Sequence, residues 1–285
     1  MSNIIDGKLV SKVLRASIKE SVDKFVADHG FTPGLAVILV GDDPASHVYV
    51  RNKHKACLDS GIHSLQIELP AETTEDELLL KIAELNNDPA VHGILVQLPL
   101  PKHINEDRVL NVISPDKDVD AFHPTNVGKI MTGKYDFLPC TPAGIMSLLD
   151  YYNVSVEGKN CVVIGRSNIV GKPMALLLLE RNGTVTVTHS RTKDLKSVAA
   201  AADILVVAIG KANFVTADFV KDGAVVVDVG INRMADGTLA GDVDFASVSP
   251  KASLITPVPG GVGPMTITTL LRNTLRAAEK FANQK

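Results

Sequence analysis

Short runs of apolar, mostly β-branched residues alternate along this chain with segments of helical periodicity. Near-continuous apolar runs of this kind are typical of strands that are buried on both faces. The runs predict strands at residues 35–40, 65–69, 93–98, 161–164, 185–188, 204–208, 225–229 and 254–256. The periodic segments predict helices at residues 44–60, 74–86, 171–181 and 264–281. Strands that alternate with helices predict an α/β fold built on parallel sheets.

Two of the predicted helices carry clear signals at their N-terminal ends. Asp43 is a good N-cap residue, Pro44 suits the first helical position, and Gly61 stands just past the end of that helix. Thr74 followed by Glu77 fits a capping box. Both helices are therefore expected to begin at these residues.

The stretch 114–140 interrupts the alternation. It is rich in Asp, Pro, Thr and Gly and poor in periodic apolar residues, which is typical of a junction between domains. The chain has 285 residues, of which 45% are hydrophobic, enough for two cores. We therefore expect two α/β lobes with a cleft between them, formed by residues 1–139 and 140–264.

Composition excludes several classes of partner. A net charge of −3, an aromatic content of 4% and the absence of Trp argue against binding to nucleic acid or to an anionic membrane. The first residues of the chain lack the pattern of a signal peptide and no apolar run is long enough to span a membrane, so we expect neither feature. Cys57, Cys140 and Cys161 form no CxxC pair, so we expect free thiols in a reducing compartment and a cytoplasmic protein.

A strand, a polar turn and the start of a helix follow one another in residues 159–173. Gly165 ends the strand, where a tight turn needs freedom in φ, and Gly171 opens the helix, where backbone N–H groups can face a phosphate. The middle glycine of GxGxxG is absent, and Ser167 stands there with a hydroxyl that can donate to a phosphate oxygen. Such a turn can also be a simple sheet connection, so the motif alone is weak evidence for a nucleotide.

The end of the next strand strengthens the case for a dinucleotide. An NAD-binding unit usually carries Asp or Glu there to accept from the ribose hydroxyls, whereas this chain has Ser190 and Arg191. A hydroxyl and a guanidinium suit a 2′-phosphate, which favours NADP as the cofactor.

Three polar residues in the first lobe are candidates for chemistry. Tyr49 and Lys53 are four residues apart on a predicted helix and therefore share a face. Most lysines in such positions are simply solvated, but a desolvated amine has a lowered pKa and can transfer protons. Gln97 lies at the carboxyl end of a predicted parallel strand, where open α/β sheets bind ligands.

Alternating aspartates at 116, 118 and 120 raise the question of a metal site. An EF-hand loop starting at Asp116 would need Gly and Glu where Ala121 and Val127 stand, which excludes it. The eight histidines show no HExxH or other paired spacing. We expect no catalytic metal.

The loop before the final helix is unusually constrained. Residues 257–266 (PVPGGVGPMT) combine glycines, which let backbone approach a ligand closely, with prolines, which hold the loop rigid. A simple turn does not need so many constraints, so this loop is a candidate binding segment.

Together these features resemble the bifunctional methylenetetrahydrofolate dehydrogenase/cyclohydrolase (FolD-like) family. The matching motifs appear in the family's order across nearly the whole chain, which makes the set specific. They are Tyr49–Lys53 (YVRNK), Val96–Pro101 (VQLPLP), Lys117–Asp120 (KDVD), Thr141–Gly144 (TPAG), Gly165–Pro173 (GRSNIVGKP), Asp228–Asn232 (DVGIN) and Thr256–Thr266 (TPVPGGVGPMT).

The resemblance implies an NADP-dependent oxidoreductase and hydrolase of one-carbon metabolism. It also implies a homodimer formed through a Rossmann-like cofactor lobe, with residues 265–285 returning to the first lobe. Tetrahydrofolate derivatives would be the substrates. Tyr49 would line the pterin pocket, Lys53 would be the acid/base of the cyclohydrolase step, Gln97 would orient Lys53, and Asp120 would grip the pterin. The remaining substrate contacts would come from Val96, Leu98, Pro259, Gly260, Gly261, Val262 and Gly263. The cofactor contacts would come from Gly165, Arg166, Ser167, Ser190, Arg191 and Ile231.

One residue departs from the family's pattern, and three rival functions remain open. Ala121 stands where the family commonly has Gly, and its methyl group would act on the loop that carries Asp120. The rivals are a two-lobe NADP dehydrogenase for a small hydroxy or amino acid, a non-catalytic NADP sensor, and a folate enzyme with only one of the two activities.

Overall fold

The computed structural model describes residues 3–284, and the chain divides into two compact units. One unit consists of Val13–Cys140 and Ile267–Lys285, and the other of Met1–Lys12 and Thr141–Thr266. Each unit contains one parallel sheet, and we name the units by their strand number, the three-stranded unit and the five-stranded unit.

The three-stranded unit has the strand order β2-β1-β3, with β1 (Gly34–Val40) in the centre. Its partners β2 (His63–Leu69) and β3 (Gly93–Val96) both run parallel to it. All seven residues of β1 are buried, as the continuous apolar run predicts for a central strand. The helices α2 (Pro44–Asp59) and α3 (Glu75–Asn87) form the connections between these strands. The predicted strands and helices of this region are thus confirmed.

Both predicted helix starts are confirmed. The side chain of Asp43 accepts a hydrogen bond from the N–H of Ser46 at 2.8 Å. Thr74 and Glu77 form both bonds of a capping box. Each cap satisfies N–H groups that have no partner within the helix. α2 and α3 therefore begin where the sequence predicts.

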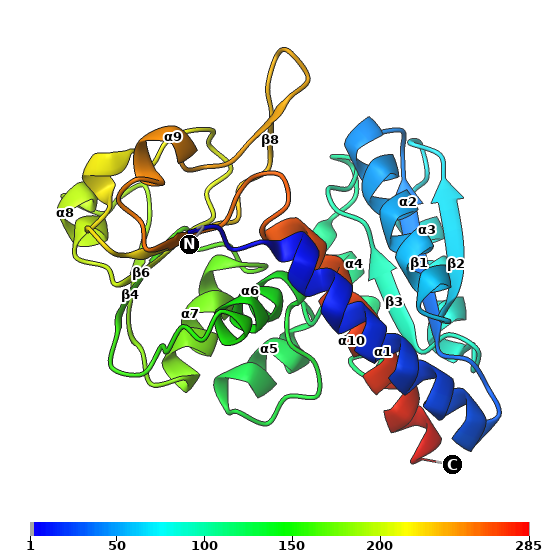
Figure 1. The fold of residues 1–285 in the computed structure, drawn as a ribbon. Coiled ribbons are helices and arrows are strands. Elements are labelled where there is room, and N and C mark those ends of the chain that lie inside the picture. Colours follow the sequence, from blue (N-terminus) through cyan, green and yellow to red (C-terminus); the bar gives the residue numbers. More distant parts are fainter. Residues whose placement is uncertain (1–2, 285) are drawn as a thin grey trace. The chain divides into compact units, whose positions relative to one another are not determined.

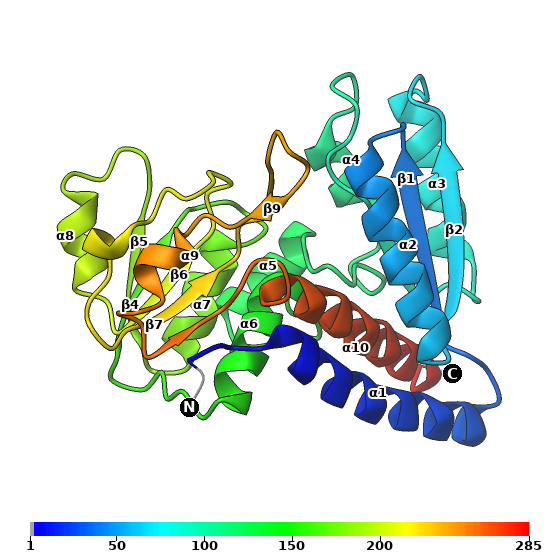
Figure 2. The same ribbon diagram turned by 45° about the horizontal axis from the view of Figure 1, so that its top comes forward.

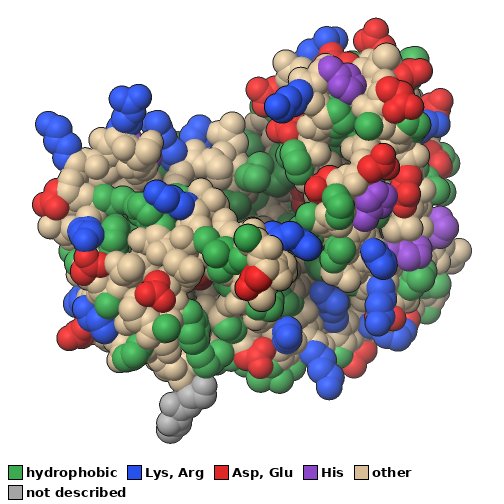
Figure 3. All heavy atoms as spheres, turned by 90° about the horizontal axis from the view of Figure 1, so that it is seen from above, with side chains coloured by type: hydrophobic (Ala, Val, Ile, Leu, Met, Phe, Trp, Pro, Cys, Tyr) green, Lys and Arg blue, Asp and Glu red, His purple; other side chains and the backbone are tan. Residues whose placement is uncertain are grey.

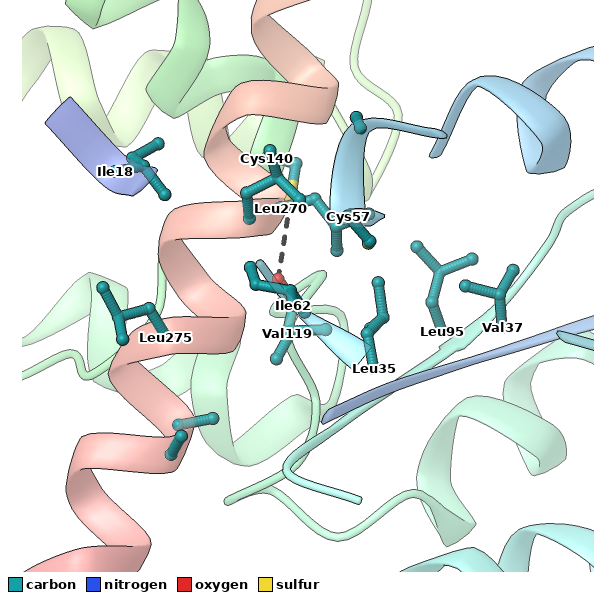
Figure 4. Packing of buried hydrophobic residues seen from close by; sticks show 14 of the residues in the cluster. Ile18, Leu35, Val37, Cys57, Ile62, Leu95, Val119, Cys140, Leu270 and Leu275 are labelled. Carbon is teal, nitrogen blue, oxygen red and sulfur yellow. Dashed lines mark hydrogen bonds between the residues drawn. The ribbon is translucent and has the colours of Figure 1, made fainter. Parts of the chain in front are cut away.

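The final helix supplies part of the core of the three-stranded unit. From Ile267 onward, α10 (Val262–Ala282) packs against the part of α1 (Gly7–His29) that follows Lys12. Figures 1 and 2 show the two helices side by side. Leu270 and Leu275 of α10 join Ile18 of α1 and Leu35 of β1 in one buried cluster, drawn in Figure 4. The predicted return of the last helix is confirmed, whereas α1 was not among the predicted helices.

Two further helices of the three-stranded unit lie where the sequence predicts none. They are α4 (Glu106–Val112) and α5 (Pro124–Met131), and α5 lies inside the stretch predicted as a polar junction. α5 begins at the N-cap His123, and its buried residues are Asn126 and Ile130. A helix this short, with a buried amide, lacks the apolar periodicity by which longer helices are predicted. The junction is therefore partly ordered structure of the three-stranded unit.

The five-stranded unit is a doubly wound parallel sheet. Its strands are β4 (Asn160–Ile164), β5 (Thr184–Thr188), β6 (Ile204–Val207), β7 (Val225–Asp228) and β10 (Leu254–Ile255), in the order β10-β7-β6-β4-β5. The remaining elements are α6 (Cys140–Tyr151), α7 (Gly171–Glu180), α8 (Leu195–Ala200), a 3₁₀ turn (Ala217–Phe219), the hairpin β8 (Asn232–Arg233) and β9 (Leu239–Ala240), and α9 (Phe245–Val248). Of these, the helices α6, α8 and α9 also lie where the sequence predicts none. The chain order reverses beside β4, because β5 lies on one side of it and β6 on the other. The predicted Rossmann-like fold is confirmed, and the carboxyl ends of β4 and β6 are where such sheets bind ligands.

The surface gives two further observations. Among the described residues, no helix is both long enough and apolar enough to cross a membrane. On the face drawn in Figure 3, basic and acidic side chains are interspersed.

Candidate active site

In the three-stranded unit, the amine of Lys53 on α2 donates a hydrogen bond to Oε1 of Gln97 at 2.9 Å. Gln97 follows directly after β3, and its backbone N–H bonds the carbonyl of Ile38 in β1. Tyr49 lies one turn before Lys53 on α2 and is 36% exposed. These three candidates thus come from the carboxyl end of the sheet and from the helix that follows β1.

The surroundings of Lys53 shift the pKa of its amine downwards. Burial lowers the pKa of Lys53, and the carboxylate of Asp120 opposes this shift. Burial also raises the pKa of the Cys57 thiol to about 12 and that of the Cys140 thiol well above its ordinary value. Both thiols therefore stay protonated and uncharged near the amine. An amine with a lowered pKa can accept and return a proton at moderate pH.

The three alternating aspartates have three different roles. Asp116 is paired with Lys280 at 2.8 Å. Asp118 is buried, and its carboxylate accepts hydrogen bonds from the backbone N–H groups of Phe122 and His123 and from the amide of Asn126. Burial raises the pKa of Asp118 despite these bonds. Asp120 is partly exposed and interacts electrostatically with Lys53. Of the three aspartates, Asp120 is thus the one that acts on the Lys53 amine.

The residues that flank Gln97 differ in exposure. Val96 is buried in the core behind the sheet, and Leu98 packs partly against the same core. The peptide bond between Leu98 and Pro99 is cis. Val96 is therefore closed to a ligand in this structure, whereas Leu98 is partly exposed.

In the five-stranded unit, two glycines bring strand, turn and helix into close contact. Gly165 has φ 123°, and a Cβ there would overlap the carbonyl oxygen of Ala208 after β6. A Cβ on Gly171 would overlap the carbonyl oxygen of Gly165. Both positions need glycine because backbone atoms fill the space. The turn after β4 thus approaches β6 at the point where the strand order reverses.

The turn between β4 and α7 carries the expected hydroxyl of Ser167, in a role that differs in part from the predicted one. Oγ of Ser167 accepts hydrogen bonds from the N–H groups of Val170 and Gly171, both at 3.2 Å. The N–H of Gly171 is therefore directed at Ser167, while the hydroxyl proton of Ser167 remains available for donation. Arg166 is exposed beside it. This turn can present a hydroxyl and a guanidinium to an anion.

The other candidate cofactor contacts also lie at the surface. Ser190 and Arg191 are exposed just after β5, where the N–H of Arg191 bonds Nδ1 of His189 at 3.1 Å. Ile231 is 43% exposed after β7. All three follow carboxyl ends of strands, the edge at which a doubly wound sheet binds its ligand.

The loop before α10 is fixed by close backbone contacts. Gly260 has φ 109°, and its carbonyl accepts from the N–H of Lys8 at 3.1 Å. A Cβ on Gly261 would lie 2.6 Å from the carbonyl oxygen of Pro257, and a Cβ on Gly7 would overlap the carbonyl oxygen of Gly261. The peptide bond between Val258 and Pro259 is cis. Pro259 is exposed, Gly260 and Gly263 are partly exposed, and Gly261 and Val262 are buried.

Two buried carboxylates near this edge were missed by the sequence reasoning. Asp242 accepts hydrogen bonds from the backbone N–H groups of residues 209–211 and from the amide of Asn232. Asp228 accepts from the N–H groups of Gly230, Asp242 and Val243, and burial raises its pKa to about 6. They shape the loops after β6 and β7. Asp228 carried a signal as the first residue of the DVGIN motif, whereas Asp242 carried none.

Among the described residues, no group of three or more His, Cys, Asp or Glu side chains could hold a metal ion. The positions of Lys53 and Ser167 are suited to proton transfer by an amine in one unit and to anion binding at a strand–turn–helix in the other.

Comparison with known proteins agrees with this division. Residues 5–120 match the catalytic domain model of tetrahydrofolate dehydrogenase/cyclohydrolase, and residues 139–282 match its NAD(P)-binding domain model. The chain is 59% identical to the bifunctional protein FolD of Streptococcus pneumoniae serotype 4 over the full length of both.

Two solved structures are similar over nearly the whole chain. The bifunctional enzyme FolD (methylenetetrahydrofolate dehydrogenase/cyclohydrolase) from Campylobacter jejuni is 52% identical with a TM-score of 0.95, covering 98% of this chain and 99% of that one. The Trypanosoma brucei N5,N10-methylenetetrahydrofolate dehydrogenase-cyclohydrolase, solved with NADP cofactor and an inhibitor, is 39% identical with a TM-score of 0.94, covering 98% of each chain.

Proposed function

Since this chain belongs to the tetrahydrofolate dehydrogenase/cyclohydrolase family, we propose that it catalyses two consecutive reactions with Lys53 as acid/base. The first is the NADP-dependent oxidation of 5,10-methylenetetrahydrofolate to 5,10-methenyltetrahydrofolate. The second is hydrolysis of the methenyl compound to 10-formyltetrahydrofolate. Residues 1–139 with 265–285 carry the folate chemistry, and residues 140–264 carry the cofactor. The observation that carries the proposal is the hydrogen bond between the desolvated Lys53 amine and Gln97.

In the oxidation, NADP held by Gly165, Arg166 and Ser167 would supply the acceptor for the hydride of the methylene carbon between two folate nitrogens. The methenyl product is cationic, so a second full positive charge beside it would oppose the reaction. The lowered pKa of Lys53 supports a neutral amine at this stage. The carboxylate of Asp120 adds negative charge to the same surroundings and accepts from the amino-pyrimidine edge of the pterin.

In the hydrolysis, water adds to the methenyl carbon and Lys53 takes the proton that water loses. The bond from this carbon to N5 then breaks, Lys53 returns the proton to N5, and loss of the hydroxyl proton to solvent leaves the formyl group on N10. One positioned acid/base typically contributes a factor of ~10²–10⁴ in rate. Gln97 holds the amine by accepting its hydrogen bond. Tyr49, one turn away on α2, lines the pterin pocket.

NADP, rather than NAD, is favoured by the residues after β5. Ser190 and Arg191 are exposed there, and no carboxylate stands at these two positions to accept from the ribose hydroxyls. A guanidinium and a hydroxyl match a 2′-phosphate. Gly165, Arg166, Ser167 and Ile231 complete the proposed contacts, and the close backbone approach at Gly165 fits a bound pyrophosphate.

The assembly and location that we propose follow from surface and thiol observations. β5 is the edge strand of its sheet, and Val187 on it and Leu179 on α7 are exposed apolar residues, which supports a homodimer through this unit. The three cysteines are free and buried, which supports a reducing cytoplasm. The loop from Pro259 to Gly263 is proposed to contact the folate.

A spectrophotometric assay with methylenetetrahydrofolate tests the proposal. The purified protein should produce the methenyl compound with NADP faster than with NAD, and should then accelerate its loss. An enzyme with only the dehydrogenase activity would form the methenyl compound and not accelerate its loss. An enzyme with only the cyclohydrolase activity would not form it. A dehydrogenase for hydroxy or amino acids would ignore folate, and an NADP sensor would reduce no cofactor while its melting midpoint rises with NADP.

A further inference from the structure

The loop that carries Asp120 is held from two directions by buried polar groups. After Asp120, the backbone N–H groups of Phe122 and His123 donate hydrogen bonds to the carboxylate of Asp118. Directly before Asp120, the carbonyl of Val119 accepts a hydrogen bond from Nδ2 of Asn273 at 2.8 Å. The residues before and after Asp120 are thus both tied to buried partners.

Asn273 lies on α10, is 4% exposed, and joins two separate segments of the chain. The same Nδ2 atom that bonds Val119 also bonds the carbonyl of Leu138 at 2.9 Å and contacts Sγ of Cys140 at 3.7 Å. The Cys140 thiol adds a second donor to the Val119 carbonyl at 3.4 Å, the bond drawn in Figure 4. Both hydrogens of the amide are therefore used, one on each carbonyl.

We infer that Asn273, assisted by Cys140, is a positioning residue that sets the direction of the Asp120 carboxylate and thereby the affinity for folate. The carbonyl of Val119 belongs to the same rigid peptide plane as the N–H and Cα of Asp120. Two donors that fix this carbonyl fix the plane, and with it the position of the Asp120 Cα from which the side chain leaves the backbone. This inference rests on the proposed pterin-binding role of Asp120.

Packing supports the same conclusion. Val119 lies over Gly93 at the start of β3, where a Cβ would be only 2.7 Å from Cγ1 of Val119. The N–H of Ile94 in β3 bonds the carbonyl of Lys117 at 2.8 Å. The loop is thus held by contacts with β3 and by the hydrogen bond from α10. Asp120 lies beside these contacts, and its side chain is partly exposed.

The experiment measures KM for methylenetetrahydrofolate, kcat, and NADP affinity in Asn273→Ala, with Thr274→Val as the matched control. Thr274 is the next residue of α10, is fully buried, and bonds only within its own helix, to the carbonyl of Leu270 at 2.8 Å. Asn273→Ala should raise KM for folate about tenfold, with kcat and NADP affinity within about twofold. Thr274→Val should change none of the three. A KM for folate that stays within about twofold of the parent value in folded Asn273→Ala overturns the inference, even if kcat falls with the amount of folded protein.

The second experiment repeats the Asn273→Ala substitution in a protein that already carries Asp120→Ala. If Asn273 acts through Asp120, then Asn273→Ala should change KM less than about twofold in a protein that already lacks the carboxylate. An equal effect in both backgrounds overturns the inference while leaving the role of Asp120 intact. If Asp120→Ala itself leaves KM for folate unchanged, the proposed role of Asp120 fails, and the inference fails with it.

Cys140 provides a second route should Asn273→Ala fail to fold. Cys140→Ala removes one donor to the Val119 carbonyl and leaves the Asn273 bonds to the carbonyls of Val119 and Leu138 in place, so KM for folate should rise by a smaller factor, about threefold. Cys140→Ser keeps a donor and should restore KM to near the parent value. If KM for folate is equal in the parent, Cys140→Ala and Cys140→Ser, Cys140 has no part in positioning Asp120. If Asn273→Ala also fails to fold, this result overturns the whole inference.

Discussion

Lys53 and Gln97 are joined by a hydrogen bond in which the orientation of the amide is fixed. Oε1 of Gln97 accepts from the Lys53 amine at 2.9 Å, while Nε2 of Gln97 donates to the carbonyl of Leu98 at 2.6 Å. Since the Nε2 end is held by this carbonyl, the oxygen end must face the amine. A fixed acceptor holds one N–H of Lys53 and leaves the rest of the amine for substrate.

Lys53→Met should remove the cyclohydrolase activity and spare the cofactor site. Loss of one acid/base should lower the hydrolysis rate by ~10²–10⁴. NADP affinity should not change, because the proposed NADP contacts lie in the five-stranded unit. The rate of methenyl decay and an NADP titration check this prediction.

Lys55→Met is the matched control for this variant, because Lys55 is an exposed lysine on the same helix. It should keep both rates. Hydrolysis by Lys53→Met at the parent rate would show that another group moves the proton.

Gln97→Glu should move the hydrolysis to higher pH. A carboxylate in place of the amide would stabilise the ammonium form and raise the pKa of Lys53. The base form of the amine is then reached only at higher pH, so the rate at pH 7 should fall about tenfold for each unit of the shift. Gln97→Met, which removes the acceptor and adds no charge, should lower the rate without this upward displacement. The measurement is the hydrolysis rate against pH for the parent, Gln97→Glu and Gln97→Met. Identical profiles for the parent and Gln97→Glu would contradict the proposed contact of Gln97 with the Lys53 amine.

The lowered pKa of Lys53 also predicts how stability depends on pH. The folded-state pKa lies below the ordinary value of 10.5 because burial disfavours the ammonium form. Between these two pKa values the unfolded chain binds more protons than the folded one, so the free energy of unfolding rises with pH. Below this window the penalty for burying the charge is fully present.

Lys53→Met lacks the titrating group and should show a smaller rise. Urea unfolding of both proteins from pH 7 to 10.5 measures the difference. Curves that stay parallel over the whole range would mean that the amine is not desolvated.

The sequence predicted the sheets and the Lys53 helix better than it predicted the surroundings of the candidate site. Continuous β-branched runs and the caps at Asp43 and Thr74 are local signals, and the structure confirms them. The bond from Asn273 to Val119 joins residues 154 positions apart, and no periodicity or spacing reports such a contact. α4 was missed although Asn105 and two acidic residues of its first turn form a start signal, because seven residues show too little periodicity.

Ala121 illustrates how a departure from a family pattern can be tolerated. Its φ is 57°, a left-handed conformation that costs an Ala about 1 kcal/mol relative to Gly, and its methyl group is fully buried. Ala121→Gly relieves this strain but loses a buried methyl worth about 0.8 kcal/mol. The two effects offset each other, so the free energy of unfolding should change by less than about 1 kcal/mol.

Ala121→Val provides the contrasting variant. A β-branched residue is poorly accommodated at positive φ, so this change should destabilise the protein by about 2 kcal/mol or more. Urea unfolding of the two variants checks both values, and equal stabilities for Gly and Val would show that the turn opens.

Gly165→Ala should abolish NADP binding, and Gly158→Ala is its matched control. Both glycines have positive φ and lie near opposite ends of β4, but only at Gly165 would a Cβ overlap another backbone atom, the carbonyl oxygen of Ala208. Around Gly158 no heavy atom lies within 4 Å of that position. Gly158→Ala should therefore cost only about 1 kcal/mol. Gly165→Ala adds overpacking and should cost about 2–4 kcal/mol, while forcing β4 and β6 apart at the proposed cofactor edge.

Thermal melts with and without NADP distinguish the two variants, because only a protein that binds the cofactor shows a higher melting midpoint. An NADP-dependent rise in Gly165→Ala equal to that of Gly158→Ala would place the cofactor away from this turn.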